Sequence, residues 1–567
     1  MTQVALIIIA SALLVFPQYY LKGFIIGSDM LFHYNRFYDA SEQIKNNNLQ
    51  YFISIYGFQQ SGRIVNSLYG PAFAYLQGLL VLVSKSWFQY QIISNFVLYV
   101  VSGVSMFILL KKMIANTWFC FGFGLFFMTT YAIQYWTNEQ GMSAWAAAVF
   151  PLCLIPLINL INKNKYCVFG VAVSIAVMFQ IHILSTLFLI FIYFTFFLYV
   201  FIKSKNKKCL LISLTKSVLL FLILTTNVWL NMIYIYSSNK LVPPFVNQNM
   251  ENNTITAGSS YWFSTPLILP LLLAIYISGV IIKRNKLSPL LILFTINTII
   301  FVLLSTNFLP WKFLSHLNNP MLGLIQFPFR FFVPGSILLI ISFALLIETI
   351  PDRRIAKPIF LVLLLGMSFI QTIYENTEHM INWRINEAPI SGRAHTYLLT
   401  QDKNDVKKSV FYREKKKLLD IYQKSTPDYL PVYGDGTGSK YNAYGDEVIL
   451  QNSKYHKEVK NKKLQITWQG KTNNWVTLPV IKYKPSVFIL NGKRLSDSDI
   501  NTSMIGGVAL KEEEGENNLI VSYKEPWFFL PSLVISFLGW TWVFLAWIKS
   551  FYKTKQINRS VKLPKNI

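Results

Sequence analysis

Three ionisable side chains follow the first hydrophobic run of this chain, in the stretch IIGSDMLFHYNRFYD (25–39). In a helix, Asp29, His33 and Arg36 would share one face, because positions i, i+4 and i+7 do so. A helix cap would account for Asp29 but not for the two basic residues beside it. His33 could pair with Asp29 and orient it, as a general base requires. We therefore predict that Asp29 is a catalytic residue and that His33 and Arg36 bind substrate.

A second carboxylate, Glu139, lies in the stretch TNEQGMSAW (137–145), between two apolar segments. Carboxylates at a membrane edge are functional candidates because they are costly to bury. The alternative is a charge at a helix N-terminus, with Asn138 as the cap. If Asp29 and Glu139 lie on the same side of the membrane, the two could converge in one catalytic site.

Other polar residues near apolar segments could bind a phosphate group. Arg330 in IQFPFRFF (325–332) suits bidentate phosphate recognition, and its aromatic neighbours could contact a lipid chain. Its alternative role is an interfacial anchor. His182 in FQIHILS (179–185) is either a phosphate contact or an ordinary polar residue at the interface. Arg63, and with a weaker signal Lys85, are anion-binding candidates in the long loop that follows the first apolar run.

Composition indicates that membrane helices position these residues. The chain has 567 residues, of which 53% are hydrophobic, and a formal net charge of +26. This profile is typical of a polytopic α-helical membrane protein. The positive residues cluster between apolar runs, which marks a cytoplasmic face, and no pattern typical of nucleic-acid binding is present. We expect about twelve transmembrane helices, at 4–22, 91–110, 115–135, 141–161, 166–182, 183–203, 209–236, 262–282, 288–307, 331–349, 357–374 and 527–548.

Two segments decide this topology. The run 166–203 has basic clusters at both ends, so it must be a hairpin of two helices that turns near His182. The apolar part of 71–86 is too short for a comfortable span, so we interpret it as a re-entrant or interfacial piece. Both termini, and the basic cluster Asp-Arg-Arg at 352–354, are then cytoplasmic.

Residues 375–526 form the only polar stretch long enough to fold independently in water. Its second half contains four strand-like runs, KLQITWQ, NWVTLPVIKY, SVFILNGKRL and NNLIVSYK, with turn residues such as Asn491-Gly492. We predict an extracytoplasmic β-rich domain here. The transmembrane domain is then 1–374, including a first outer loop at 23–90, and 527–567 is the last transmembrane helix with a basic cytoplasmic tail.

The chain resembles the GT-C superfamily of integral membrane glycosyltransferases. It is most similar to the YfhO-like bacterial membrane proteins and to those labelled "6-pyruvoyl-tetrahydropterin synthase related". The resemblance rests on GSDMLFHYNR (27–36), LYGPAFAYLQGLLVLVS (68–84), SNFVLYVVSGVSMFILLKK (94–112) and QFPFRFF (326–332) in the helical part, and on DYLPVY (428–433) and VTLPVIKYKPSVFILNGKRL (476–495) in the insert.

The resemblance implies a polyprenyl-phosphate sugar donor and an extracytoplasmic site in a bacterial cell membrane. Asp29 matches the first-loop carboxylate of the family, the presumed general base, and Glu139 matches the acidic position of the next outer loop. His182 and Arg330 fall where contacts to the lipid phosphate are expected. Many relatives have two acids in the second loop, whereas TNEQ has one carboxylate, which leaves open whether Mg²⁺ or Mn²⁺ takes part.

The expected function is inverting transfer of a sugar to a cell-envelope glycopolymer, such as a wall polysaccharide or a teichoic acid. Two alternatives stay open. A non-catalytic envelope scaffold would not need Asp29 and Glu139 to converge. A flippase for lipid-linked sugars would favour broken helices at the bilayer midplane and repeated halves, whereas the ionisable groups lie at helix ends. The chain contains no phosphate loop, no GxSxG elbow and no HExxH metal pair.

Overall fold

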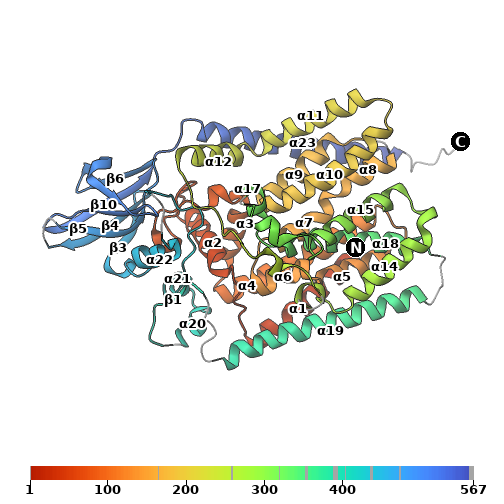
Figure 1. The fold of residues 1–567 in the computed structure, drawn as a ribbon, viewed down its shortest axis with the longest axis horizontal. Helices are drawn as coiled ribbons and strands as arrows, with labels where there is room; N and C mark the ends of the chain where they lie inside the picture. The colour runs from red at the N-terminus through yellow and green to blue at the C-terminus, as the bar shows by residue number, and fades with distance from the viewer. Residues whose placement is uncertain are drawn as a thin grey trace.

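The computed structural model describes residues 2–163, 165–256, 260–317, 319–350, 356–386, 394–402, 404–434, 438–471 and 474–560. Helices fill one end of the molecule and strands fill the other (Figure 1). We call residues 394–526 the β-rich part and the segment between the first two long helices, residues 22–86, the first loop. The basic cluster 352–354 lies outside the described residues.

Among the described residues, seven helical segments are long and apolar enough to cross a membrane, each at a position that the sequence predicts. A helix that is apolar around its whole circumference needs either a protein core or lipid around it. The seven are α1 (Thr2–Leu21), α4 (Trp87–Leu110), α7 (Ser143–Cys153) with α8 (Ile155–Lys163), α10 (Ile183–Lys203), α18 (Phe332–Glu348) with the turn before it, α19 (Ala356–Ile385) and α23 (Phe529–Ser560).

The other predicted spans are shorter or bent. α11 (Lys207–Leu224) and α12 (Thr226–Ser238) meet at an angle of 72° and would make an eighth span if the pair crosses as one. The remaining four predicted spans contain α5 (Thr117–Met128), α9 (Val168–Ile181), α14 (Leu269–Lys283) and α15 (Pro289–Leu304). Each of these has fewer residues than the 20 or so that a perpendicular span needs. The structure thus confirms a helical protein with membrane-spanning segments, and the count of twelve stays a prediction.

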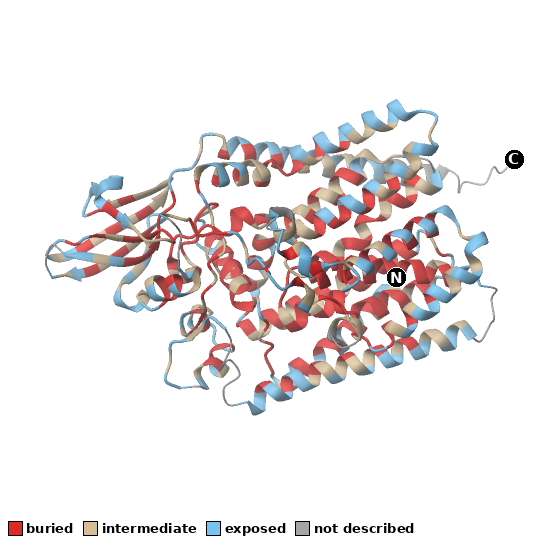
Figure 2. Ribbon diagram, viewed as in Figure 1, coloured by how far each residue is buried: buried red, intermediate tan, exposed pale blue. Residues whose placement is uncertain are grey.

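Burial separates a central helix from the peripheral ones. In α18, 89% of the most apolar window is buried, whereas in α19 and α23 only 17% is. Figure 2 shows the buried residues concentrated in the middle of the helical part, with exposed residues along the outer helices. Exposed apolar surface on α19 and α23 is what a lipid-facing helix presents, because lipid tails are as apolar as these side chains.

The first loop contains two helices that pack on each other. α2 (Met30–Lys45) follows Asp29, and α3 (Pro71–Val83) has 13 residues. Gly78 of α3 lies so close to α2 that a Cβ there would be 2.9 Å from the Cβ of Ala40. α3 is therefore a short apolar helix packed against α2, and the interpretation of 71–86 as a re-entrant or interfacial piece stays a prediction.

The β-rich part contains all four predicted strand runs, arranged in two larger sheets. One sheet has the order β3-β4-β10-β6-β7 and the other β5-β9-β8, all antiparallel. Positive φ angles at Asn491 and Gly492 make the tight turn between β6 and β7. The strands are β3 (His456–Lys460), β4 (Lys463–Gly470), β5 (Trp475–Ile481), β6 (Ser486–Leu490), β7 (Lys493–Arg494), β8 (Ile500–Thr502), β9 (Gly507–Lys511) and β10 (Gly515–Tyr523).

The core of the β-rich part includes the middle of the first loop, residues 51–68. Tyr51, Phe52 and Ile64 belong to the same buried cluster as the inward-facing residues of both sheets. Backbone contacts join the two segments, because the N–H of Ile481 donates to the Ser61 carbonyl at 2.8 Å. Residues 51–68 of the first loop are therefore packed into the β-rich part, whereas α2 and α3 contribute Tyr34, Phe37 and Phe73 to the core of the helical part. The boundary predicted at residue 375 lies inside α19, which continues to Ile385.

Candidate functional site

The structure brings Asp29 and Glu139 together. Glu139 is the last residue of α6 (Tyr131–Glu139), and Gln140 turns the chain with a φ of 57°. The N–H of Asp29 donates to the backbone carbonyl of Glu139 at 3.2 Å, and the N–H of Ser28 donates to Glu139 Oε2 at 3.2 Å. Glu139 thus holds the start of α2 in place. Its position at the end of a helix excludes the alternative role as a charge at a helix N-terminus.

A glycine makes this close approach possible. Gly27 lies against the backbone of Glu139, so a Cβ at position 27 would be 2.7 Å from Glu139 Cα. No ordinary side chain fits this space. The juxtaposition of the two carboxylate-bearing segments therefore rests on one residue without a side chain, which the sequence places directly before Ser28 and Asp29.

Two cations lie within electrostatic range of Asp29. Lys424, at the end of β2 (Tyr422–Lys424), donates from Nζ to the Ser28 carbonyl at 2.6 Å. Burial raises the pKa of the Asp29 carboxyl, the charges of Lys424 and then Arg330 oppose this rise, and Glu139 adds to it. Within the described ranges, neither carboxylate forms a salt bridge with either cation. Among the described residues, these charges are therefore not paired with one another.

His33 and Arg36 contact each other instead of Asp29. His33 Nδ1 lies 3.2 Å from Arg36 Nη1, so the predicted pairing of His33 with Asp29 is wrong for the side chains. Arg36 also donates from Nε to Asn66 Oδ1 at 3.0 Å and from Nη2 to the Tyr69 carbonyl at 3.1 Å. Burial and the adjacent Arg36 hold the pKa of His33 well below its usual range. These contacts fasten residues 66–69 of the first loop to α2, and a substrate-binding role for the pair stays a prediction.

His182 lies at the break between α9 and α10, where the sequence predicts the hairpin turn. Its Nδ1 caps α10, since the N–H of Ser185 donates to it at 3.4 Å. Burial, with a smaller contribution from Arg330, lowers the pKa of His182 to about 3. A neutral ring whose Nδ1 accepts a hydrogen bond carries its proton on Nε2, so Nε2 is the atom that can donate to a ligand.

Arg330 keeps a cationic head near Asp29 and His182. Its Nη1 donates to Gln326 Oε1 and to the Ile325 carbonyl, and its guanidinium lies 5.0 Å from the ring centre of Phe327. In the part of the chain that the structure describes, no carboxylate lies within 4.0 Å of this guanidinium. The group is held in position without being neutralised, as an anion-binding residue requires.

Arg63 connects the first loop to the β-rich part. It is fully buried and donates from Nη2 to the Asp428 carbonyl at 2.7 Å. Its guanidinium lies 4.8 Å from the ring centre of Phe58 and 5.1 Å from that of Tyr444. These are structural contacts, so the anion-binding prediction for Arg63 has no support here. Lys85 is exposed, and its backbone N–H donates to Gln89 Oε1.

Lys424 and Asp428 belong to the site and were not singled out from the sequence. Asp428 lies within electrostatic range of Asp29, and burial raises the pKa of the Asp428 carboxyl to about 6. Both residues lie in QKSTPDYLPVY (423–433), and β2 is only three residues long. The stretch DYLPVY (428–433) is one of the signals of resemblance, but it carries no indication that Lys424, four residues before it, would lie against residue 28.

The site offers few ligands for a metal ion. No group of three or more histidine, cysteine, aspartate or glutamate side chains gathers among the described residues. Asp29 and Glu139 could together provide two carboxylates, which suffices for Mg²⁺ only when phosphate oxygens and water complete its shell. Because Glu139 Oε2 already accepts from Ser28, a divalent cation stays an open prediction.

Fold and site together define a helical membrane protein whose polar site lies where the helices meet a β-rich part. A scan of protein-family models finds no match to this chain, and a search of the curated proteins finds none.

Proposed function

We propose that this chain is an integral membrane glycosyltransferase. It would move a sugar from a polyprenyl-phosphate donor to a cell-envelope glycopolymer, with inversion, at the extracytoplasmic face of a bacterial membrane. The observation that carries the proposal is the junction between Asp29 and Glu139, with Lys424 and Arg330 within electrostatic range. Proton transfer requires a carboxylate and phosphate departure requires cations, and both kinds of group lie together here.

Each group has a role in the proposed reaction. Asp29 accepts the proton of an acceptor hydroxyl, whose oxygen attacks the anomeric carbon from the face opposite the phosphate. The bond from that carbon to the phosphate oxygen breaks, and the polyprenyl phosphate leaves with its electron pair. Lys424, Arg330 and the Nε2–H of His182 stabilise the leaving phosphate. Burial raises the pKa of Asp29, which improves a carboxylate as a base near neutral pH.

Aromatic side chains beside Arg330 support a lipid-linked donor. The rings of Trp262 and Phe329 stack with centres 4.4 Å apart, and Phe327 stacks on Phe329 at 5.5 Å. The ring of Phe245 in turn stacks on Phe327 and is itself partly exposed. An isoprenoid chain is apolar, so such a surface next to a cation suits a molecule with a greasy tail and a charged head.

A non-catalytic scaffold would not need Asp29 and Glu139 to lie together. The contacts between their two segments therefore favour a catalytic site over a scaffold. The flippase alternative is favoured by charges at the bilayer midplane and by helices broken there. The bent pair α11–α12 is one broken helix, but Asp29, Glu139 and Lys424 lie outside all seven candidate spans. Transfer chemistry therefore remains the best supported reading.

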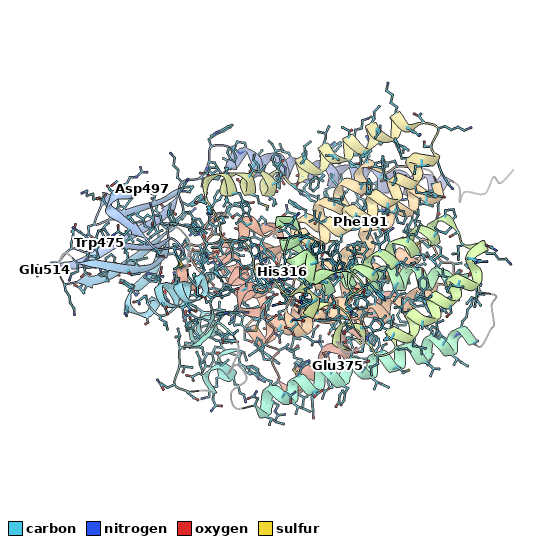
Figure 3. The ribbon with its side chains drawn as sticks, in the orientation of Figure 1. Phe191, His316, Glu375, Trp475, Asp497 and Glu514 are labelled. Carbon is cyan, nitrogen blue, oxygen red and sulfur yellow. The ribbon has the colours of Figure 1, made fainter. Side chains whose placement is uncertain are left out.

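The test compares envelope glycans from four strains, namely wild type, a deletion strain, Asp29→Asn and the control Glu514→Gln. Figure 3 shows Glu514 at the far tip of the β-rich part, so the control removes one carboxylate away from the site. We expect Asp29→Asn to lower sugar transfer by about 10²–10⁴-fold, the usual contribution of a general base, and Glu514→Gln to retain it. A deletion strain that loses no sugar would refute the proposed function, and normal transfer by Asp29→Asn would refute the role of Asp29.

A further inference from the structure

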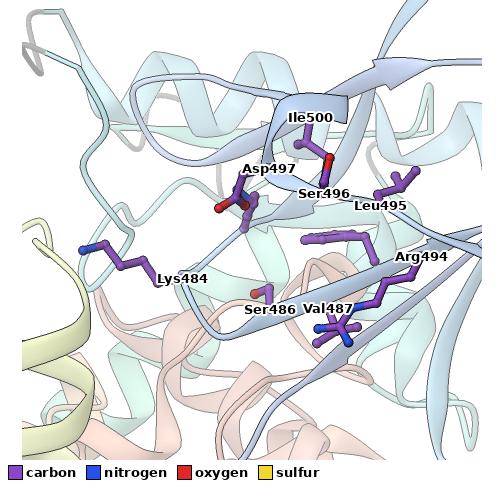
Figure 4. Close-up of a pocket in the computed structure, with 10 residues that line it drawn as sticks. Lys484, Ser486, Val487, Arg494, Leu495, Ser496, Asp497 and Ile500 are labelled. Carbon is purple, nitrogen blue, oxygen red and sulfur yellow. The ribbon is translucent and has the colours of Figure 1, made fainter.

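A cavity of about 410 Å³ opens in the β-rich part, and none of its lining residues belongs to the candidate site. Figure 4 shows its wall, formed by β6, β7, the segment between β5 and β6, and the turn before β8. Tyr433 and Gly506 fix the base of that segment, because the Tyr433 hydroxyl donates to the Lys482 carbonyl and the Lys482 N–H donates to the Gly506 carbonyl. These hydrogen bonds hold the segment between β5 and β6 in place as one wall of the cavity.

The cavity is positively charged. Lys482, Lys484 and Arg494 line it, and Asp497 is the one carboxylate among the lining residues. No carboxylate lies within 4.0 Å of the Lys484 or Arg494 charge in the described ranges of the chain. Three cations against one anion leave an excess of two positive charges, so the cavity attracts an anion.

Lys482 shows that the cavity can hold an anion against a buried cation. Its side chain is 90% buried, and its Nζ lies 2.6 Å from Asp497 Oδ1, yet the Asp497 side chain is 93% exposed. A buried ammonium group needs a partner because its desolvation is costly. Here the partner is the carboxylate of Asp497, so Lys482 is already paired, and the exposed Lys484 and Arg494 are the cations that a ligand would meet.

The dimensions and the remaining walls define the class of ligand. A volume of about 410 Å³ lies in the range of small-molecule sites and exceeds what one phosphate ion fills. Phe488, Leu495 and Ile500 supply apolar surface beside the cations. We propose that this cavity binds a phosphodiester chain, with Lys484 at one edge and Arg494 at the other (Figure 4) contacting different phosphates and the apolar residues against the carbon units between them.

The location favours a soluble chain over a lipid headgroup. Figure 3 shows Asp497 on the β-rich part, at the end of the molecule away from the membrane-spanning helices. A bilayer phosphate would lie at the level of the helix ends. A role for this cavity in holding an anionic acceptor rests on the proposed function, whereas the binding itself does not.

The test is direct binding to the full-length protein in nanodiscs of neutral lipid. The probe is an oligomer of poly(glycerol phosphate), with oligoglycerol of matched length as the uncharged comparison, measured by isothermal titration calorimetry. The double variant Lys484→Gln/Arg494→Gln should weaken binding by at least about tenfold, because it removes two charge-assisted hydrogen bonds. The matched control Lys463→Gln/Lys493→Gln removes two exposed lysines outside the cavity and should change the affinity by less than about twofold.

Several outcomes would overturn this proposal. Equal weakening in both double variants would mean that general surface charge binds the oligomer, and equal affinity for oligoglycerol would mean that the phosphate is not recognised. If the soluble oligomer does not bind but vesicles of anionic lipid bind and lose affinity only with the cavity variant, the ligand is a lipid headgroup. None of these measurements uses transferase activity, so failure here is distinguishable from failure of the proposed function.

Discussion

The substitution Gly27→Ala tests whether the two carboxylate-bearing segments are packed as closely as the structure indicates. The added methyl carbon would lie 2.7 Å from Glu139 Cα and close to the carbonyl of that residue. Carbon atoms in contact are usually 3.5–4.0 Å apart, so one segment must move by about 1 Å. Such overpacking costs about 1–3 kcal/mol.

The same movement breaks the two hydrogen bonds that join Ser28 and Asp29 to Glu139, at about 0.5–1.5 kcal/mol each. Together, these effects predict a loss of about 2–6 kcal/mol in the free energy of unfolding. A displacement of this size at a catalytic base also predicts a loss of about 10²-fold in transfer rate.

The assay is unfolding of the purified protein from detergent micelles by a graded denaturing detergent, followed by circular dichroism. The matched control is Gly366→Ala in α19, where a Cβ would meet nothing within 4 Å. Because alanine favours a helix over glycine, the control should gain about 0.5–1 kcal/mol. If Gly27→Ala is as stable as the control, the close approach of residues 27 and 139 is wrong, and the site built on it is wrong as well.

Three further substitutions test individual groups. Burial raises the pKa of Asp39 to about 6. The stability that its protonated form contributes is therefore complete below the ordinary pKa near 4 and is lost as the pH rises through 6, so wild type should lose about 3 kcal/mol of unfolding free energy relative to Asp39→Asn between these limits. Unfolding titrations of the two proteins measure this difference, and parallel pH profiles would contradict it. His182→Ala should lower the unfolding free energy by about 1 kcal/mol, because the Ser185 N–H loses its acceptor. His182→Asn should retain most of this stability, since asparagine also caps helices. Equal losses in the two variants would show that the cap does not contribute to stability. Arg63→Met should lower the unfolding free energy by about 1.5–3 kcal/mol through the lost charged hydrogen bond to Asp428, and an unchanged midpoint would mean that this contact does not hold the first loop to the β-rich part.

Local patterns predicted several elements well. The break at His182 followed from basic clusters at both ends of one apolar run, since only a hairpin lets both ends lie on the same side. The four strand runs followed from alternation of apolar residues and from the Asn491-Gly492 turn. In each case the signal lies within a few residues of the feature that it predicts, so tertiary contacts were not needed to find it.

The helix lengths were harder to predict because apolar composition does not report where a helix breaks. The run 209–236 is predicted as one span from its overall hydropathy, yet the chain bends by 72° near Thr225. The predicted span 115–135 likewise ends as a helix at Met128, and α6 begins at Tyr131. The hydroxyls of Thr129 and Thr130 bond to backbone carbonyls three residues earlier, a local alternative to the helical ladder that hydropathy cannot register.

The partners of Asp29 illustrate a second limit of prediction from sequence, which concerns contacts between distant segments. Acidic residues at membrane edges are rare enough for Asp29 and Glu139 to stand out, but lysine is common in the β-rich part, and Lys424 lies on a strand of three residues. Its place is set by pairing with β1 (Thr396–Leu398), whose register aligns Thr396 with Lys424. That pairing is a contact between distant segments, so no local sequence pattern predicts it.

The position of Lys424 has a consequence for how the site assembles. The start of α2 is held from both sides, by Glu139 of the helical part and by Lys424 of the β-rich part. Neither part alone supplies both an acid and a cation to residue 28. The charge environment of Asp29 therefore depends on the docking of the two parts, and a movement that withdraws Lys424 would raise the pKa of Asp29 further, since its positive charge is the largest influence opposing burial.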